Sequence, residues 1–344
     1  MKKILIIRFS SIGDIIQCMS VIDYIKTQYP KAEIHWIARK DMSEFLHMDT
    51  RINKVWGFDK KLGFKGLINI IEKLKEENFD FIYDAHSNIR SNIIKAKLCP
   101  WWKRIFGIGP KLTLRSKERI KRILLFNFRV DLFPMPFKGI HSFVKPLKKF
   151  GVDINSNPVK YNSWVFPKEL ISKIDKKIFE DNKINIQKTI TIVPSAAWEM
   201  KRWPIEHWKK LVKLMPNYNF IILAGPADTF CKEIESVDSK RVYNLAGKTS
   251  LFESCYIVKK SSIVVSADTG FLHAADMFGI KGISIVGPTA FGYTTGKHIT
   301  TLETNLKCRP CTKDGRGKCK QKIYKKCLVD ITPELVKNQI ENLK

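Results

Sequence analysis

The chain has 344 residues, of which 44% are hydrophobic and 27% are charged. This is the composition of a folded globular protein, and the length suffices for two domains with separate cores. No run of 18 apolar residues occurs, which excludes a conventional membrane-spanning helix. The apolar run Ile4–Ile7 before Arg8 is too short for a secretory signal, so we expect the protein to remain in the cytoplasm.

A large positive charge distinguishes this sequence. It contains 61 Lys and Arg against 33 Asp and Glu, a net charge of +28. Residues 101–149 hold 13 of these cations and only two acidic residues, Glu118 and Asp131. Such an excess attracts anionic partners, and nucleic acid, phospholipid headgroups and phosphorylated glycolipid all qualify. A general enrichment of lysine in the source proteome is the alternative explanation of the total.

Apolar runs typical of buried strands alternate with amphipathic stretches in the first half of the chain. The predicted order is strand Ile4–Ile7, helix Asp14–Gln28, strand Glu33–Ala38, helix 41–48, strand Lys54–Phe58, helix 65–78 and strand Phe79–Ala85. The pattern becomes unclear from 100 to 140, and residues 141–150 are again helical in pattern. Repeated strand-helix units of this length predict a doubly wound parallel sheet.

A polar stretch at 151–168 precedes a second alternating series. Its predicted strands are Thr189–Val193, Phe220–Ala224, Val242–Ala246, Ser262–Ser266 and Gly282–Val286, with helices at 204–215, 228–236, 251–259 and 270–279. A last helix, Ile331–Leu343, has Thr332 as its N-cap and Pro333 in its first turn. The sequence therefore predicts an α/β protein with two Rossmann-like lobes, 1–165 and 166–330, and a closing helix at 331–344. In such lobes ligands bind at the carboxyl ends of the strands.

The first strand is followed by small residues and an acidic one, at positions 10–14. Gly13 permits a close approach of the backbone, and the helix N-terminus that follows favours an anion or a carboxylate. Asp14 also has a purely structural explanation, because an acidic residue in a first helical turn complements the helix dipole. With a single glycine this turn lacks the dinucleotide-binding fingerprint, which argues against a nicotinamide dehydrogenase.

Two loops after predicted strands of the second lobe have features of a phosphate site. Small residues at 194–197 precede the adjacent cations Lys201 and Arg202, which suit the diphosphate of a nucleotide. The turn 266–270 exposes backbone donors at a helix start, and His273 lies one turn further on the same face. A solvated cation pair and an ordinary helix cap with a buried histidine are the structural alternatives.

Taken in order, these segments resemble glycosyltransferase family 9, the heptosyltransferases of lipopolysaccharide core assembly, over nearly the whole chain. The motifs that produce the resemblance are Ser10-Ser11-Ile12-Gly13-Asp14, residues 83–91, Lys201-Arg202-Trp203-Pro204, residues 244–251, Asp268-Thr269-Gly270 with His273, and Gly287-Pro288-Thr289.

The resemblance implies a GT-B fold and an inverting, metal-independent transfer of heptose from ADP-heptose, with no cofactor. It implies that Asp14 is the general base and that Lys201 stabilises charge on the departing ADP. The other donor-binding residues that it implies are Ser195, Ala196, Glu233, Leu245, Ala246, Gly247, Lys248, Asp268, Thr269, Gly270 and His273. The acceptor-binding residues that it implies are Ser10, Ser11, Gly13, Asp84, His86 and Arg90.

Three positions depart from the family pattern. Ser20 replaces the usual proline of the first helix, and Ser195 replaces the glycine of a Pro-Gly-Ala element. The loop 290–293 replaces the more usual Asp-Pro, which leaves the identity of the donor sugar open.

Four cysteines near the C-terminus, Cys308, Cys311, Cys319 and Cys327, have the spacing C-x2-C-x7-C-x7-C. In a cytosolic protein such cysteines favour a metal over a disulfide; we expect reduced, locally packed thiols, with a structural zinc site as the alternative. A catalytic metal is not expected, because the implied mechanism does not use one.

The expected partners follow from the resemblance. They are a nucleotide-sugar donor and an anionic lipid A/Kdo core acceptor, reached by peripheral contact with the cytoplasmic face of the inner membrane, with the basic stretch 101–149 facing the acceptor. A related transferase that uses another nucleotide sugar, such as an N-acetylhexosamine donor, is the main alternative. A basic nucleic-acid-binding protein is the other, but no nucleic-acid-binding motif occurs, so no nucleic-acid partner is expected.

Overall fold

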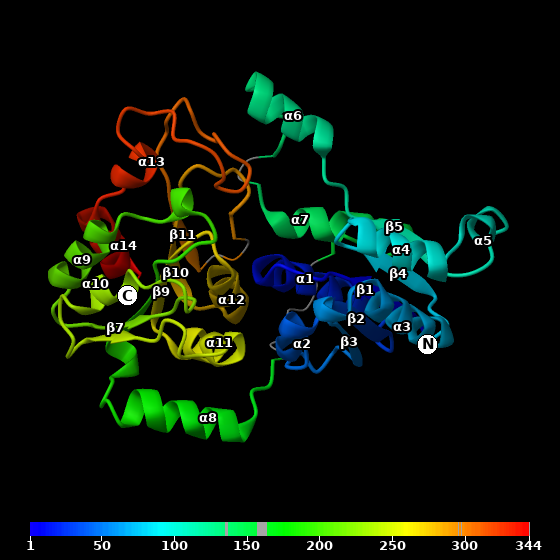
Figure 1. The fold of residues 1–344 in the computed structure, drawn as a ribbon, viewed down its shortest axis with the longest axis horizontal. Coiled ribbons are helices and arrows are strands. Elements are labelled where there is room, and N and C mark those ends of the chain that lie inside the picture. Colours follow the sequence, from blue (N-terminus) through cyan, green and yellow to red (C-terminus); the bar gives the residue numbers. More distant parts are fainter. Residues whose placement is uncertain (135–136, 157–163, 295, 297, 344) are drawn as a thin grey trace. The chain divides into compact units, whose positions relative to one another are not determined.

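The structure, a computed structural model, describes residues 1–134, 137–156, 164–294, 296 and 298–343. The chain divides into two units. Figure 1 labels their helices and strands and colours the chain along its sequence from blue to red. Unit 1 comprises Met1–Glu118 and Ile140–Val165, and unit 2 comprises Arg119–Gly139 and Phe166–Lys344. The segment Arg119–Gly139, which we expected in the first lobe, thus groups with the second.

Unit 1 is built on a five-stranded parallel sheet of order β3-β2-β1-β4-β5. Its strands are β1 Lys3–Ile7, β2 Glu33–Arg39, β3 Lys54–Phe58, β4 Phe81–Asp84 and β5 Lys111–Leu114. Its helices are α1 Ile12–Gln28, α2 Lys40–Leu46, α3 Gly63–Glu76, α4 Ile89–Leu98 and α5 Trp101–Ile105, and α7 Gly139–Val144 follows where the chain re-enters the unit. The central strand β1 is buried from Ile4 to Ile7, as its unbroken apolar run predicts.

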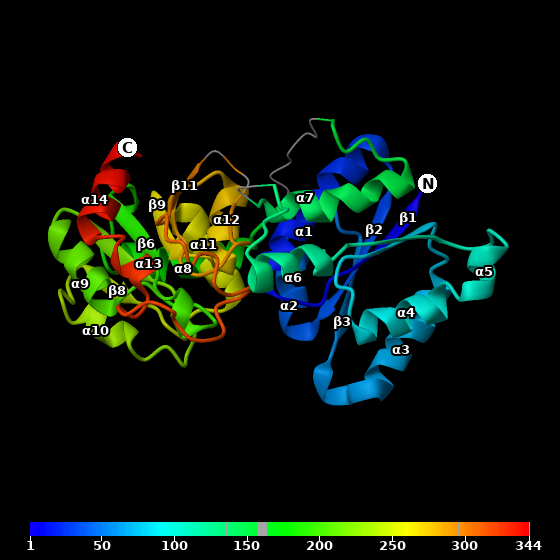
Figure 2. The same ribbon diagram turned by 90° about the horizontal axis from the view of Figure 1, so that it is seen from above.

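Helices cover both faces of this sheet (Figure 2). Leu5 and Ile7 of β1 pack in one core with Leu67 and Ile71 of α3 and with residues of α4. Successive side chains of a strand point to opposite faces, so Ile4 and Ile6 face the other side, where α1 contributes buried residues. The result is the doubly wound arrangement that the alternating pattern predicts.

Unit 2 repeats the design with six parallel strands in the order β11-β10-β9-β6-β7-β8. The strands are β6 Thr189–Val193, β7 Asn219–Ile222, β8 Val242–Asn244, β9 Ile263–Ala267, β10 Lys281–Ile285 and β11 Ile299–Leu302. The helices are α6 Arg119–Phe128, α8 Lys168–Ile174, α9 Ile205–Leu214, α10 Cys231–Glu235, α11 Leu251–Lys260, α12 Gly270–Phe278, α13 Lys326–Val329 and α14 Pro333–Asn342. Ile190 and Ile192 of β6 pack in one core with buried residues of α9, α10 and α14. The closing helix is thereby part of this core.

Most predicted elements are confirmed to within two or three residues, and Lys54–Phe58 and Thr189–Val193 have the predicted bounds. The stretch 100–140, where the pattern is unclear, contains α5, β5 and α6. Strand β11 and the helices α4, α8 and α13 were not predicted either. Part of the polar stretch expected to link the lobes, 157–163, lies outside the described residues.

No helix among the residues that the structure describes has the length and apolar character needed to cross a membrane.

Candidate functional site

Asp14 lies in the first turn of α1, directly after the carboxyl end of β1. Its carboxylate forms an ion pair with Arg8, with 2.5 Å between Nη2 and Oδ2, and Arg115 lies 3.6 Å from Oδ1. The Ser11 hydroxyl donates a hydrogen bond to Oδ2 at 3.0 Å. The side chain of Asp14 is 35% exposed, so these contacts orient the carboxylate while leaving it open to solvent.

The two arginines beside Asp14 are held by buried partners. Arg8 donates to the carbonyl oxygen of Ala85 at 2.7 Å, and the Arg115 guanidinium lies 3.6 Å from the centre of the Phe143 ring. Burial, followed by the charge of Arg8, lowers the pKa of Arg115. The largely buried guanidinium groups of Arg8 and Arg115 carry two positive charges beside the single negative charge of Asp14. The remaining positive charge suits an anionic ligand.

Asp84 and His86 follow the carboxyl end of β4. Asp84 is fully buried, accepts hydrogen bonds from the backbone N–H groups of His86 and Ser87, and pairs with Lys95 at 2.6 Å. It therefore shapes the turn and does not reach solvent, although it was expected to bind the acceptor. Burial, and then the nearby Arg8, lowers the pKa of His86 to about 4, so its imidazole is neutral at physiological pH.

The other residues expected at the acceptor differ in exposure. Ser11 is exposed at the start of α1, Ser10 is half-buried and Gly13 is buried within the helix. Arg90 is exposed on α4, where its guanidinium lies 5.6 Å from the centre of the Phe58 ring. Unit 1 thus brings Ser11 together with Asp14 at the end of β1, next to the β4 turn that contains His86.

In unit 2 the structure brings together Lys201, Asp268 and His273. Lys201 Nζ donates to the carbonyl oxygen of Asp268 at 2.6 Å and to its Oδ2 at 2.7 Å, and His273 Nε2 lies 3.6 Å from Oδ1. Burial opposes the ionisation of Asp268, but Lys201 and His273 outweigh it and hold the pKa of that carboxyl well below its ordinary value. A lysine fixed by a permanent anion at the carboxyl end of β9 is well placed to meet a phosphate.

The turn that contains Asp268 opens helix α12. Thr269 is the N-cap with extended backbone, and its hydroxyl bonds that of Ser266 at 2.8 Å rather than capping the helix. Gly270 is the first helical residue, and the first amides of a helix have no acceptor within it, so they can bind an anion. A Cβ atom on Gly292 would lie 2.2 Å from Cγ of Asp268, which places the loop after β10 directly against this turn.

Ser195 is already engaged in a polar network at the end of β6. Its hydroxyl donates to Asp228 Oδ2 at 2.6 Å, the Gly225 amide donates to the same oxygen, and Arg202 pairs with Oδ1 at 3.1 Å. Ala196 is buried and offers Arg202 its carbonyl oxygen. Asp228 therefore links the loops after β6 and β7, which the sequence alone did not reveal.

The turn 245–248 follows β8 and lies beside the loop after β7. The Gly247 amide donates to the carbonyl oxygen of Ala224, and its φ of +70° together with the closeness of Pro226 leaves no room for a side chain. Gly247 and Lys248 are exposed, whereas Leu245 and Ala246 are half-buried. Glu233 is exposed on α10, and it is Glu235 that contacts this turn, through Asn244.

The four C-terminal cysteines are all free thiols, with Cys327 buried and the other three half-buried. Burial raises the pKa of Cys327 to about 11 and also raises that of Cys311, with smaller contributions from neighbouring thiols of the group. Within the described residues no three of their sulfurs come within 4.8 Å of one another. The four thiols thus lie near one another, and a metal bound by them stays a prediction.

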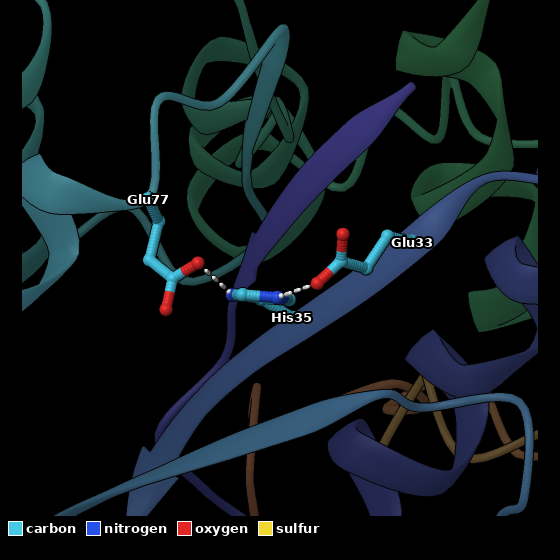
Figure 3. A group of neighbouring side chains, drawn as sticks. All are labelled: Glu33, His35 and Glu77. Carbon is cyan, nitrogen blue, oxygen red and sulfur yellow. Dashed lines mark hydrogen bonds and ion pairs between the residues drawn. The ribbon is translucent and has the colours of Figure 1, made fainter. Parts of the chain in front are cut away.

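A second cluster, Glu33, His35 and Glu77, does bring three metal-ligand atoms within 4.8 Å (Figure 3). Glu33 Oε1 lies 2.8 Å from Nε2 of the buried His35, and Glu77 Oε2 lies 3.9 Å from its Nδ1. Lys54 and Lys3 bind the two oxygens of Glu77 at 2.6 and 2.9 Å. Since lysine already neutralises Glu77, the cluster forms an ion-pair network at the amino-terminal end of the sheet, opposite to Asp14.

Three residues of these sites were not predicted as functional: Arg115, Asp228 and Arg8. Arg8 stands next to the Ser10–Asp14 motif, and its position at a strand end was the available signal. Arg115 follows the unpredicted strand β5, and Asp228 acts through Ser195 and Arg202, which are distant in sequence. Neither therefore has a local sequence signal.

Comparison with known proteins identifies the family of the chain. The chain matches glycosyltransferase family 9 (heptosyltransferase) over residues 67–324. It is 26% identical over 296 residues to the lipopolysaccharide core heptosyltransferase OpsX of Haemophilus influenzae, covering 84% of this chain and 79% of that protein.

Two solved structures share the fold. A glycosyl transferase family 9 protein from Veillonella parvula has a TM-score of 0.78 at 17% identity, with 99% of this chain and 97% of the other covered. The ADP-heptose lps heptosyltransferase II of E. coli has a TM-score of 0.74 at 17% identity, with 100% and 98% covered. The fold is thus the GT-B fold predicted from the motifs, and the chain belongs to glycosyltransferase family 9, the family of the heptosyltransferases.

Proposed function

We propose that this enzyme transfers heptose from ADP-heptose to the inner core of lipopolysaccharide, with inversion at the anomeric carbon and without a metal ion. One observation carries the proposal: in a chain of this family, Lys201, Asp268 and His273 meet at the start of α12, at the carboxyl ends of the strands of unit 2. A cation and a helix N-terminus together suit the diphosphate of a nucleotide sugar.

The residues of unit 2 bind the donor. Lys201 and the amides after Thr269 bind the diphosphate and stabilise its charge as it departs. The turn 245–248 borders the adenosine, and Gly247 lets the backbone approach it closely. Ser195 acts through its network with Asp228, which fixes the loop that contains Lys201 and Arg202.

The residues of unit 1 act on the acceptor. The acceptor hydroxyl oxygen forms a bond to the anomeric carbon while the bond from that carbon to the ADP oxygen breaks. ADP leaves with the electron pair, and the acceptor proton moves to the carboxylate of Asp14, the general base. Arg8 and Arg115 orient this carboxylate and supply positive charge for an acidic inner-core sugar.

The acceptor is attached to a lipid, so the enzyme works in the cytoplasm at the inner face of the cytoplasmic membrane, by peripheral contact. The net charge of +28 supports this location, because it attracts anionic headgroups.

The test combines ligand binding with transfer. Purified protein is incubated with ADP-heptose, ADP-glucose and UDP-N-acetylglucosamine, and thermal unfolding is followed for ligand-induced stabilisation. We expect ADP-heptose to stabilise the protein most and, with heptose-deficient lipooligosaccharide, to add one heptose detectable by mass spectrometry. Stabilisation by the UDP-sugar alone would favour the alternative donor and contradict the proposal.

A further inference from the structure

Helix α6 and the residues after it expose a row of apolar side chains. Five large apolar residues of the segment 119–132 are between 46% and 76% exposed: Ile120, Ile123, Phe128, Val130 and Leu132. We call them the α6 surface. Exposed apolar residues that cluster in this way mark a site of interaction, whereas isolated ones do not.

The helix is firmly attached to unit 2 by its other side. Leu125 is buried in a small core with Phe133, Phe137 and Ala290. Phe126 packs edge-on against Phe291 at 5.9 Å, the guanidinium of Arg122 lies 4.5 Å from the same ring, and Arg129 donates to the carbonyl oxygen of Pro310 at 2.6 Å. One apolar side of α6 is thus covered by its own unit while the α6 surface is uncovered.

The charge of this segment suits one kind of partner. Residues 119–130 contain Arg119, Lys121, Arg122 and Arg129 and no acidic residue. Cations beside exposed Ile and Phe characterise helices that lie in the interface of an anionic bilayer, where the apolar residues enter the acyl boundary and the cations meet phosphate. Nucleic-acid phosphates would use the cations but not the aliphatic side chains.

The position of the helix within unit 2 connects it to the turn 266–270, which we call the donor turn. Phe291, on which α6 packs, is next to Gly292, whose position lies directly against Asp268. A partner bound to α6 would therefore lie near the loop 291–292, which contacts Asp268.

We propose that the α6 surface is the membrane-binding site of the enzyme, inserting into an anionic phospholipid leaflet so that the donor turn of unit 2 lies close to the lipid-anchored acceptor. This inference rests on the proposed function, since it supposes an acceptor that is held in a membrane.

The test uses the full chain and vesicles of phosphatidylcholine, with or without phosphatidylglycerol, in a flotation assay. We expect binding to the anionic vesicles only, weakening with added salt. The triple change Ile120→Ser, Ile123→Ser and Phe128→Ser should lower the vesicle partition coefficient roughly tenfold or more, because it removes most of the inserted apolar area.

A matched control lies on unit 1. Leu62 and Phe64 are 60% and 64% exposed and stand among Lys60, Lys61 and Lys65, so Leu62→Ser with Phe64→Ser is matched to the double change Ile120→Ser with Phe128→Ser, which is measured beside the triple one. We expect this variant to bind vesicles like the unaltered protein. Equal loss in both variants would mean that exposed apolar area in general causes binding, and would overturn the assignment to α6.

Further readouts separate this proposal from its rivals. Undiminished vesicle binding by the triple variant overturns it, and so does a wild-type dimer that the triple change converts to a monomer in light scattering, because the surface would then bind a second copy. If the triple variant fails to fold, Arg119→Glu tests the same surface through its charge, and unchanged vesicle binding by this variant would also overturn the proposal.

Transfer to a delipidated, water-soluble acceptor should be unchanged in the triple variant while transfer to vesicle-bound acceptor falls. Absence of all transfer by the unaltered protein, with vesicle binding intact, would refute the proposed function and leave the membrane site standing.

Discussion

Asp14 has two possible explanations, helix stabilisation and a catalytic carboxylate, and its contacts favour the second. An acidic residue in a first helical turn is common for reasons of helix stability alone, and α1 begins at Ile12 with Asp14 in that turn. Here, however, the carboxylate also receives Arg8, Arg115 and the Ser11 hydroxyl. Helix capping requires none of these three contacts, whereas a base that must hold one orientation toward an acceptor uses all of them.

Replacing Asp14 by Asn tests the general-base role. The substitution keeps size and helix position but removes the proton acceptor, so we expect the turnover number to fall by about 10²–10⁴-fold, the usual contribution of such a group. Binding of ADP should be nearly unchanged, because the residues expected to bind it lie in unit 2. Steady-state transfer assays and calorimetric titration with ADP measure the two effects.

Asp41 offers a matched control for this experiment. It also lies in the first turn of a unit 1 helix, α2, and also pairs with an arginine, Arg39. Asp41→Asn should leave transfer unaltered. If both variants lose the same activity, Asp14 acts through helix stability. If Asp14→Asn retains turnover, Asp14 is not the general base.

At the level of single residues, the sequence predicts the positions that stand in compact motifs. Lys201 and the motif that contains Asp268 and His273 come from distant segments of the chain, yet each has a recognisable local setting, and the structure brings them together. Asp228 has no such setting, since its partners Ser195 and Arg202 precede it by about 30 residues and meet it only through the parallel sheet.

Among the larger elements, the loop that contains the cysteines supports Lys201, which we propose to bind the donor. Gly315, with a φ of +95°, lies so close to Lys201 that a Cβ atom would stand 2.7 Å from Cγ of the lysine and 3.1 Å from Cβ of Trp198. Lys325 and Tyr324 of the same loop bind Glu199, two residues before Lys201. The loop therefore helps to fix the direction of the Lys201 side chain.

Gly315→Ala is expected to weaken ADP binding on the order of tenfold. The added methyl group displaces Lys201 from Asp268, and the loss of one well-placed charged hydrogen bond has about this effect on affinity. Calorimetric titration with ADP measures it. Gly63→Ala is the control: Gly63 also has a positive φ, of +52°, but no atom lies within 4 Å of its Cβ position. Equal weakening in the two variants would show that backbone strain alone, rather than contact with Lys201, causes the loss.

At the amino-terminal end of the unit 1 sheet, Glu77 forms ion pairs with Lys3 and Lys54 whose strength depends on pH. The hydrogen bond from Lys54, with a further one from Lys3, overcomes the opposing effect of burial and lowers the pKa of Glu77 to about 2 from its ordinary 4.5. A depressed carboxyl pKa contributes stability that is fully present above the unfolded value and is lost as the pH falls toward the folded one.

Glu77→Gln should therefore destabilise the protein at pH 7, by on the order of 2 kcal/mol after allowance for the half-exposed Lys54. The difference from the unaltered protein should shrink as the pH falls from about 4.5 to about 2, because Glu77 itself becomes protonated over this range. Urea unfolding across this pH range measures the difference. Glu76→Gln, at the exposed neighbouring position, should show no such trend, and a difference independent of pH would exclude the ionised carboxylate as its cause.

At the level of elements, the strands that the sequence predicts best are the fully buried ones. Thr189–Val193 is buried at every residue, so its apolar run is unbroken. Edge strands give weaker patterns: β5 has one buried residue, Thr113, and β11 is buried only at its two ends. These strands are stabilised by pairing with β4 and β10, which no local window of sequence can reveal.

The molecule as a whole consists of two units, and the chain crosses between them more than once. It enters unit 2 at Arg119, returns to unit 1 at Ile140 and leaves again after Val165. The excursion is explained by the burial of Leu125, Phe133 and Phe137 against Ala290, more than 150 residues later. Because this contact is long-range, a simple division of the sequence at residue 165 could not predict it.

This division predicts where a nucleotide alone should protect the protein. Every residue expected to bind the donor lies in unit 2, so ADP should slow backbone hydrogen exchange in residues 195–203, 244–249 and 268–273. The loops 8–14 and 84–91 of unit 1 should exchange at their unliganded rates. The physical reason is that a ligand reduces only those opening motions that expose its own contacts.

The high net charge makes a control necessary, because ADP could bind non-specifically to a protein with a charge of +28. Exchange is therefore measured by mass spectrometry at low and at near-physiological ionic strength, and again for Lys201→Gln. Protection at the donor site should persist in salt, since short-range contacts of partly buried groups are screened little, and it should be reduced in the variant. Protection that appears instead over the basic stretch 101–149 and vanishes with salt would identify an electrostatic association, and protection of loop 8–14 by ADP alone would contradict the assignment of donor binding to unit 2.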